Sequence, residues 1–198
     1  MKSVRPVLLA AAPALLGLVP AVREVLLYDR TAILQGEWWR LWTGHWMHFT
    51  ASHLTWNLLV LAGAGWWLER VQPGSLLRYL AVAAPMLGVS FLAGAPGMGT
   101  YGGLSGLATG VVVLLALAQL GRDRAARAWW LGLLALVALK LALDAAQPAP
   151  LFASFGAQVV RVSTFAHVMG AITAVGFFLS RRLGWRDELR RPAAAHAQ

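Results

Sequence analysis

The chain has 198 residues, of which 59% are hydrophobic and only 13% are charged. A soluble domain of this length carries about a quarter charged residues and just under half apolar ones, so a single water-soluble core could not hide this apolar surplus. A soluble enzyme, a disordered chain and a disulfide-framed secreted module are therefore excluded, and the absence of cysteine also excludes thiolate metal ligands and a cysteine nucleophile. Membrane proteins carry an excess of Lys and Arg in their cytoplasmic segments, and this excess explains the net charge of +9. The predicted partner is therefore the lipid bilayer and not nucleic acid.

Six apolar stretches reach or approach the roughly 20 residues that a membrane helix needs. Backbone groups in hydrocarbon must be hydrogen-bonded within their own segment, which makes each stretch a helix. The sequence therefore predicts an all-α membrane protein, with six transmembrane helices in a single domain over residues 1–198 and a short basic cytoplasmic tail at 181–198. The predicted spans are residues 4–22, 52–68, 79–95, 104–120, 128–147 and 163–180.

The distribution of positive charge predicts the orientation. With the N-terminus inside, 12 of the 17 Lys and Arg residues fall on the inner side, four fall in outer links and Lys140 lies within a span. The positive-inside rule then places both termini in the cytoplasm. A competing interpretation is a cleavable signal peptide, because Lys2 and Arg5 precede an apolar run that ends in Val19-Pro20-Ala21. Cleavage would leave five spans with the same orientation.

Polar side chains inside the spans are few, and each is a functional candidate by default. Spans two, four and six all run from outside to inside, so their first turns lie at the same depth. His53 and Asn57 lie near the start of span two, Ser105 opens span four, and His167 lies about one turn into span six. At 1.5 Å per residue, three helices therefore bring polar groups to one layer near the outer face.

These residue types suit acyl transfer. A serine hydroxyl is a weak nucleophile until a base within hydrogen-bond reach takes its proton, and His is the usual base. We therefore expect Ser105 to be the nucleophile and His167 the general base. His53 and Asn57 are four residues apart on one helix face and can point two donors at one oxyanion. Small residues at helical spacing would let spans four and six approach closely: Gly103, Gly106, Gly110, Gly170 and Ala174.

Two other interpretations compete with this one. Gly, Ser and a lone His are common packing residues in membrane helices, although four polar positions at one depth make a packing role a poor explanation. His45, His48 and His53 could also suggest a metal site near the outer surface. His53 lies 140° around the helix from His48, however, and no cysteine or suitably spaced carboxylate completes a tetrahedral set. No metal and no cofactor are expected.

At these residues the chain resembles the rhomboid family of intramembrane serine proteases over nearly its whole length. The resemblance implies a six-helix bundle with a water-filled cavity that opens outward and a Ser105–His167 dyad. It also implies that the Ser105 backbone amide, His53 and Asn57 stabilise the oxyanion, that His48 supports the site, and that Arg40 and Glu69 fix loops. The segments that carry the resemblance are Trp39-Arg40, His48-Phe49 with His53 and Asn57, Gly103-Leu104-Ser105-Gly106, and Ala166-His167-Val168-Met169-Gly170.

Within the family, the amino-acid sequence of residues 39–48 and 101–106 looks most like that of the rhombosortases. This resemblance implies a bacterial inner-membrane sorting protease whose site opens to the periplasmic side. Its substrates would be secreted proteins that end in a Gly-Gly motif, a membrane helix and a basic tail. The alternatives are a general rhomboid protease with other transmembrane substrates and an inactive relative that only binds helices. One turn past the serine, where the family often has an aromatic or a His, this chain has Thr109.

A further expectation is that Asp144 in span five is not a third catalytic residue. Lys140 lies four residues earlier on the same helix face and offers Asp144 an ion-pair partner. The rhomboid resemblance also implies that span five lies at the side of the bundle, away from the dyad.

Overall fold

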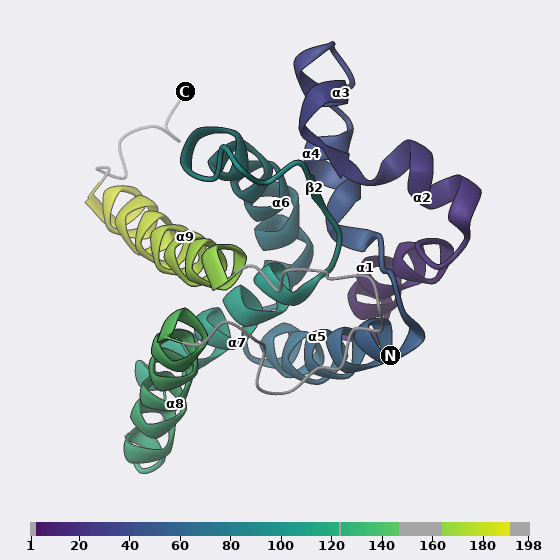
Figure 1. The fold of residues 1–198 in the computed structure, drawn as a ribbon. Helices are drawn as coiled ribbons and strands as arrows, with labels where there is room; N and C mark the ends of the chain where they lie inside the picture. Colours follow the sequence, from purple (N-terminus) through teal and green to yellow (C-terminus); the bar gives the residue numbers. More distant parts are fainter. Residues whose placement is uncertain (1–2, 123, 147–163, 191–198) are drawn as a thin grey trace.

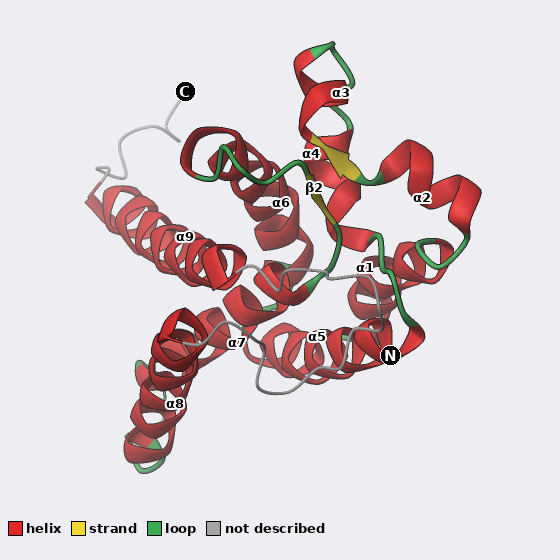
Figure 2. Ribbon diagram, in the orientation of Figure 1, coloured by secondary structure: helices red, strands yellow, loops and turns green. Residues whose placement is uncertain are grey.

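The computed structural model describes residues 3–122, 124–146 and 164–190, with side chains up to Arg182 in the last range. These parts form helices, one 3₁₀ turn and a single pair of two-residue strands (Figure 2). In chain order the elements are α1 (Val4–Leu16), α2 (Pro20–Leu26), β1 (Tyr28–Asp29), α3 (Arg30–Leu34), α4 (Arg40–Thr43), η1 (Gly44–Trp46), α5 (Ala51–Val71), α6 (Ser75–Gly94), β2 (Thr100–Tyr101), α7 (Ser105–Leu120), α8 (Arg127–Ala146) and α9 (Thr164–Arg190).

Each of the six predicted spans overlaps a helix, which confirms a multi-pass helical membrane protein. Among the described residues, α6, α8 and the Thr164–Arg182 part of α9 are long and apolar enough to cross a membrane. The 21 residues of α5 are also long enough, at about 30 Å, but polar residues such as His53 and Asn57 lower its mean hydropathy. The 16-residue α7 is shorter than a bilayer core. The count of six spans therefore stays a prediction.

The first predicted span is not one continuous helix. The helix stops at Leu16 instead of Val22, and α2 leaves at an angle of 108°. Gly17 lies against the later chain so closely that a Cβ there would sit 2.4 Å from the Trp46 carbonyl oxygen. Pro20, which has no N–H to donate, then starts α2. A contact with a segment 29 residues further on thus ends the helix.

Other span boundaries shift because of local capping. The third span begins at Ser75, four residues before the predicted start, because the Glu69 carboxylate accepts hydrogen bonds from the backbone N–H groups of Gly74 (2.8 Å) and Leu76 (2.7 Å). A carboxylate there satisfies N–H groups that the first helical turn would otherwise leave unpaired. The expectation that Glu69 fixes a loop is confirmed.

Arg40 fixes the segment that leads into α5, as expected. Its guanidinium donates to the Glu37 carboxylate at 2.6 Å and to the carbonyl oxygens of Glu24 at 2.9 Å and Leu27 at 2.8 Å. These bonds tie α4 to α2 and the start of the β1 strand. Strand β1 in turn pairs antiparallel with β2, with Tyr28 opposite Tyr101, so the segment that precedes α7 is anchored as well.

Helix α7 forms the centre of the bundle, between α5, α8 and α9 (Figure 1). Of its 16 residues, 11 are buried, whereas α8 buries only Trp130 and lies at the outside. Helices α7 and α9 cross in direct backbone contact, because a Cβ on Gly170 would lie 1.9 Å from the Gly106 carbonyl oxygen. The close approach predicted from these two glycines is therefore present.

Candidate active site

Ser105 is the first residue of α7, and the chain that delivers it is buried. The four preceding residues, from Tyr101 to Leu104, are all buried although they are not helical. Irregular backbone at membrane depth is tolerated only where protein surrounds it. Gly103 adopts a φ of +138°, and a Cβ there would lie 2.6 Å from Cε1 of His53. Only glycine fits between the strand and the histidine ring.

His53 reaches this position because of the way α5 begins. The Thr50 side chain accepts a hydrogen bond from the His53 backbone N–H at 3.2 Å and caps the helix, so His53 lies in its first turn. His53 is 7% exposed, and its ring packs edge to face against that of His48, with ring centroids 5.0 Å apart. The structure thus brings His53 beside the Gly103–Leu104 backbone, on the N-terminal side of Ser105.

His48 holds Asn57 and has a defined tautomer. Its Nδ1 lies 2.9 Å from the Trp46 carbonyl oxygen, which can only accept, so Nδ1 carries the proton and Nε2 is an acceptor. Nε2 then accepts from the Asn57 amide at 3.2 Å and lies 3.5 Å from the Leu104 backbone nitrogen. Burial, helped by the nearby His53, lowers the pKa of His48 to about 4, which keeps the ring neutral for this role. His48 therefore links Asn57 to the chain before Ser105.

His167 lies in the first turn of α9 and is 4% exposed. Its neighbour Ala166 touches the residue after Ser105, since a Cβ on Gly106 would lie 2.7 Å from the Ala166 carbonyl oxygen. Ser105 and His167 therefore flank one crossing of α7 and α9. Within the described part of the chain, no hydrogen bond joins the Ser105 hydroxyl to His167. Catalytic hydrogen bonds are often long without substrate and tighten when it binds.

Asp144 lies beside His167, contrary to expectation. Its Oδ2 is 3.4 Å from His167 Nδ1, and Lys140 Nζ is also 3.4 Å from that nitrogen. The predicted Lys140–Asp144 ion pair is present. The expectation that span five keeps Asp144 away from the dyad is wrong, because α8 is peripheral along most of its length but its C-terminal end reaches the start of α9.

Tyr101 is a site residue that the sequence analysis did not single out. Its hydroxyl donates to the Gly103 carbonyl oxygen at 2.9 Å and is a hydrogen-bond neighbour of the Ser105 side chain. Burial raises the pKa of the Tyr101 phenol to about 12, although hydrogen bonds with Ser105 and the Gly106 backbone oppose the shift. The phenol therefore stays a donor and shapes the turn before Ser105. A tyrosine two residues before a Gly-x-Ser-Gly motif was the available signal.

The structure places the remaining candidates in supporting positions. Thr109 donates to the carbonyl oxygen of Ser105 at 2.8 Å, so its hydroxyl is used within α7. Gly110 makes room for the Tyr79 hydroxyl, which donates to the Gly170 carbonyl oxygen at 3.1 Å and ties α6 to α9. Ala174 is buried.

Within the part of the chain that the structure describes, His45, His48 and His53 do not form a metal-binding group. His45 Nε2 lies 2.8 Å from the Ala84 carbonyl oxygen, which makes this nitrogen the donor, and the ring packs beside Phe91 and Tyr101. Burial lowers the pKa of His45 to about 4. Across the described ranges, no three His, Asp or Glu side chains are placed to hold a metal ion.

The fold and the site define a multi-pass membrane protein with a serine and a histidine at one buried helix crossing. The Rhomboid domain profile matches residues 35–183, which is most of the chain. The chain is also similar to the Rhomboid protease GluP of Bacillus subtilis (strain 168), with 29% identity over 159 residues, which are 79% of this chain and 28% of that protein. The chain thus spans under a third of this relative. It belongs to the rhomboid family, whose members are generally intramembrane serine proteases.

Proposed function

We propose that the protein is an intramembrane serine endopeptidase in which Ser105 is the nucleophile and His167 the general base. The observation that supports the proposal is the α7–α9 crossing, where Gly106, the residue after Ser105, lies against Ala166, the residue before His167. The protein would cut membrane-anchored proteins near the outer face of the membrane. Both termini would face the cytoplasm, as the distribution of Lys and Arg indicates.

The reaction would follow the chemistry of serine acyl transfer. The Ser105 oxygen attacks the substrate carbonyl carbon while His167 Nε2 takes the hydroxyl proton. The carbonyl oxygen becomes an oxyanion, and the Ser105 backbone N–H, His53 and Asn57 donate to it. One of the two Asn57 N–H groups is held by His48, which leaves the other for this purpose. His167 then gives its proton to the leaving amine, and water releases the acyl group from Ser105.

The finer proposal concerns the substrate. The amino-acid sequence of residues 39–48 and 101–106 supports a rhombosortase type of enzyme. Such an enzyme would process secreted proteins at a C-terminal Gly-Gly motif that precedes a membrane helix and a basic tail. A general rhomboid protease with other transmembrane substrates is the alternative, and an inactive helix-binding relative is a third possibility. The intact Ser105 and His167 argue against the third.

A reporter in proteoliposomes tests both levels of the proposal. The purified protein is expected to cut a reporter with a Gly-Gly motif before its membrane helix, and replacing Gly-Gly by Leu-Leu should slow cleavage by at least about tenfold, the discrimination that pocket shape typically gives. Cleavage is read from product size and by mass spectrometry of the new terminus. Equal cleavage of both reporters would favour the general rhomboid alternative. Binding of the reporter helix without any cleavage would contradict the protease assignment.

A further inference from the structure

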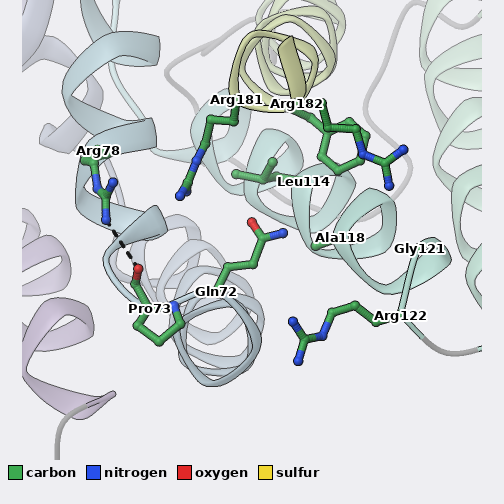
Figure 3. Close-up of a pocket in the computed structure, with 10 residues that line it drawn as sticks. Gln72, Pro73, Arg78, Leu114, Ala118, Gly121, Arg122, Arg181 and Arg182 are labelled. Carbon is green, nitrogen blue, oxygen red and sulfur yellow. Dashed lines mark hydrogen bonds between the residues drawn. The ribbon is translucent and has the colours of Figure 1, made fainter. Parts of the chain in front are cut away.

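A hollow lies at the opposite end of α7 from Ser105. It has a volume of about 750 Å³ and is bounded by the α5–α6 turn, the C-terminal end of α7 and the later turns of α9 (Figure 3). Ala118 and Gly121, which contribute to its wall, are 13 and 16 residues after Ser105, or about 20–24 Å along the helix. This cavity is therefore separate from the candidate active site.

Four arginines line the cavity, and among the residues that the structure describes no acidic side chain contributes to its lining. In Figure 3 the side chains of Arg78, Arg122 and Arg181 surround Gln72, while Arg182 lies along the rim. Four like charges around one hollow repel one another, and the repulsion is stronger beside a low-dielectric membrane than in water. An anion in the cavity would relieve this repulsion.

Three of the four guanidinium groups are held in place before any ligand binds. That of Arg78 donates to the carbonyl oxygens of Gly74 at 2.7 Å and Pro73 at 3.4 Å. Arg181 donates to the Ser75 hydroxyl at 2.5 Å and also lies over the ring of Phe177, at 5.9 Å from its centroid. Arg182 lies over the ring of Phe178, at 4.8 Å from its centroid. A guanidinium that is already oriented loses less conformational entropy when it forms a bidentate pair of hydrogen bonds with an oxyanion.

We propose that this cavity binds the phosphodiester headgroup of an anionic phospholipid. The arginine guanidinium groups of the cavity can donate paired hydrogen bonds to the phosphate oxygens. The glycerol and the first acyl carbons would contact its apolar part, which is formed by Leu114, Ala118 and Phe178. The predicted orientation puts this end of α7 at the cytoplasmic leaflet, where anionic lipids attract basic residues. A free phosphate offers the same oxygens but not the apolar part.

Native mass spectrometry of the full-length protein tests the proposal, with phosphatidylglycerol as the probe and phosphatidylcholine as the neutral competitor. The double variant R122Q/R182Q, which leaves the Arg181–Ser75 bond intact, is expected to weaken phosphatidylglycerol binding by at least about tenfold, because two charge-assisted contacts are lost. The matched control is R70Q/R127Q, which removes the same charge from two exposed arginines outside the cavity. The control should change binding by less than about twofold.

Several results would overturn this inference. Equal losses in the two double variants would mean that general surface charge attracts the lipid. Displacement of the lipid by millimolar inorganic phosphate would assign the cavity to a soluble anion. If R122Q/R182Q does not fold, R122K/R182K keeps the charge but not the fork, and unchanged binding by that variant would also contradict the proposal. None of these outcomes depends on protease activity.

A second, independent observation concerns Asp144. We infer that this carboxylate is a positioning residue for His167, an inference that rests on the proposed function. The side chain of Asp144 is 7% exposed, and its Oδ2 lies 3.4 Å from His167 Nδ1. A carboxylate can only accept a hydrogen bond, so it favours the tautomer with the proton on Nδ1. That tautomer leaves the Nε2 lone pair for the Ser105 proton.

Lys140 acts in the opposite direction on the same nitrogen. Its ammonium can only donate, so a direct Lys140–His167 bond would require an unprotonated Nδ1 and would put the proton on Nε2, where it cannot help Ser105. The ion pair with Asp144 occupies the ammonium and lowers the cost of burying the carboxylate. Asp144 thus orients His167, while Lys140 mainly stabilises Asp144.

Steady-state kinetics of three variants distinguish a positioning role from a structural one. D144N is expected to lower kcat by about 10- to 100-fold with KM changed by less than about threefold, a smaller loss than the ~10⁴-fold of a full triad because Asp144 is shared with Lys140. D144E should recover most of the turnover. The variant K140Q, which removes the ion pair but keeps Asp144, should stay within about threefold of the parent.

Equal losses in D144N and K140Q would mean that the ion pair matters only for packing, and full turnover of D144N would remove Asp144 from the mechanism. Thermal unfolding of each variant shows whether it folds, and D144E keeps the test informative if D144N does not. Either negative result leaves Ser105 reactive towards a fluorophosphonate. A parent protein that neither cuts nor reacts would instead refute the proposed function itself.

Discussion

Replacing Ser105 by alanine is expected to abolish cleavage of a membrane reporter, with turnover reduced by at least about 10⁴-fold, and His167→Ala should have the same effect. When two residues act as one unit, removing either costs nearly as much as removing both, so the double variant should be no worse than the singles. The measurement is the initial rate of cleavage in proteoliposomes that contain equal amounts of folded protein.

Ser90→Ala is the matched control, because Ser90 is a half-buried helix serine whose hydroxyl donates to the Leu87 carbonyl oxygen at 2.7 Å. This variant should keep the parent rate. A fluorophosphonate should label the parent and Ser90→Ala but not Ser105→Ala. Cleavage at near the normal rate by Ser105→Ala would end the serine protease assignment.

The sequence predicts well what depends on local composition. Helices form where the apolar stretches predict them, and the close approach predicted from Gly106 and Gly170 is present between α7 and α9. The roles of Arg40 and Glu69 in fixing loops were implied by the family resemblance and are confirmed by their hydrogen bonds.

What the sequence could not predict depends on contacts between distant segments. Helix α1 ends early because Gly17 meets Trp46, and no local pattern records that contact. The family resemblance implied that span five keeps Asp144 away from the dyad, but tertiary packing brings the C-terminal end of α8 beside His167. Tyr101 was missed because its hydroxyl acts on the turn before Ser105, whose irregular conformation becomes visible only in three dimensions.

Loss of an oxyanion donor is the other change with a large expected effect. His53→Phe keeps a ring beside Gly103 but removes both nitrogens, and Asn57→Leu keeps a similar volume but removes the amide. Each is expected to lower kcat by about 10²–10³-fold, as loss of one donor does in other oxyanion holes. Substrate affinity should change far less, because these donors act on a charge that exists only in the transition state.

Asn57 also has a structural partner, so its proposed role as an oxyanion donor has to be distinguished from its role in packing. Its amide donates to His48 Nε2, so Asn57→Leu removes that bond as well as the proposed donor. Thr55→Ala is the matched control on the same helix, because Thr55 is exposed and donates only to the Ala51 carbonyl oxygen, at 2.9 Å. It should leave turnover and thermal stability unchanged.

The informative quantity is the split between turnover and binding, measured with the reporter in proteoliposomes and, for binding alone, in a Ser105→Ala background. A variant that binds normally and turns over slowly fits a donor to the oxyanion. If His53→Phe or Asn57→Leu instead loses binding while the remaining complex turns over normally, the residue docks substrate. If Asn57→Leu lowers the unfolding temperature but turns over normally, the role of Asn57 is limited to its hydrogen bond with His48. The oxyanion would then be stabilised by His53 and the Ser105 backbone N–H.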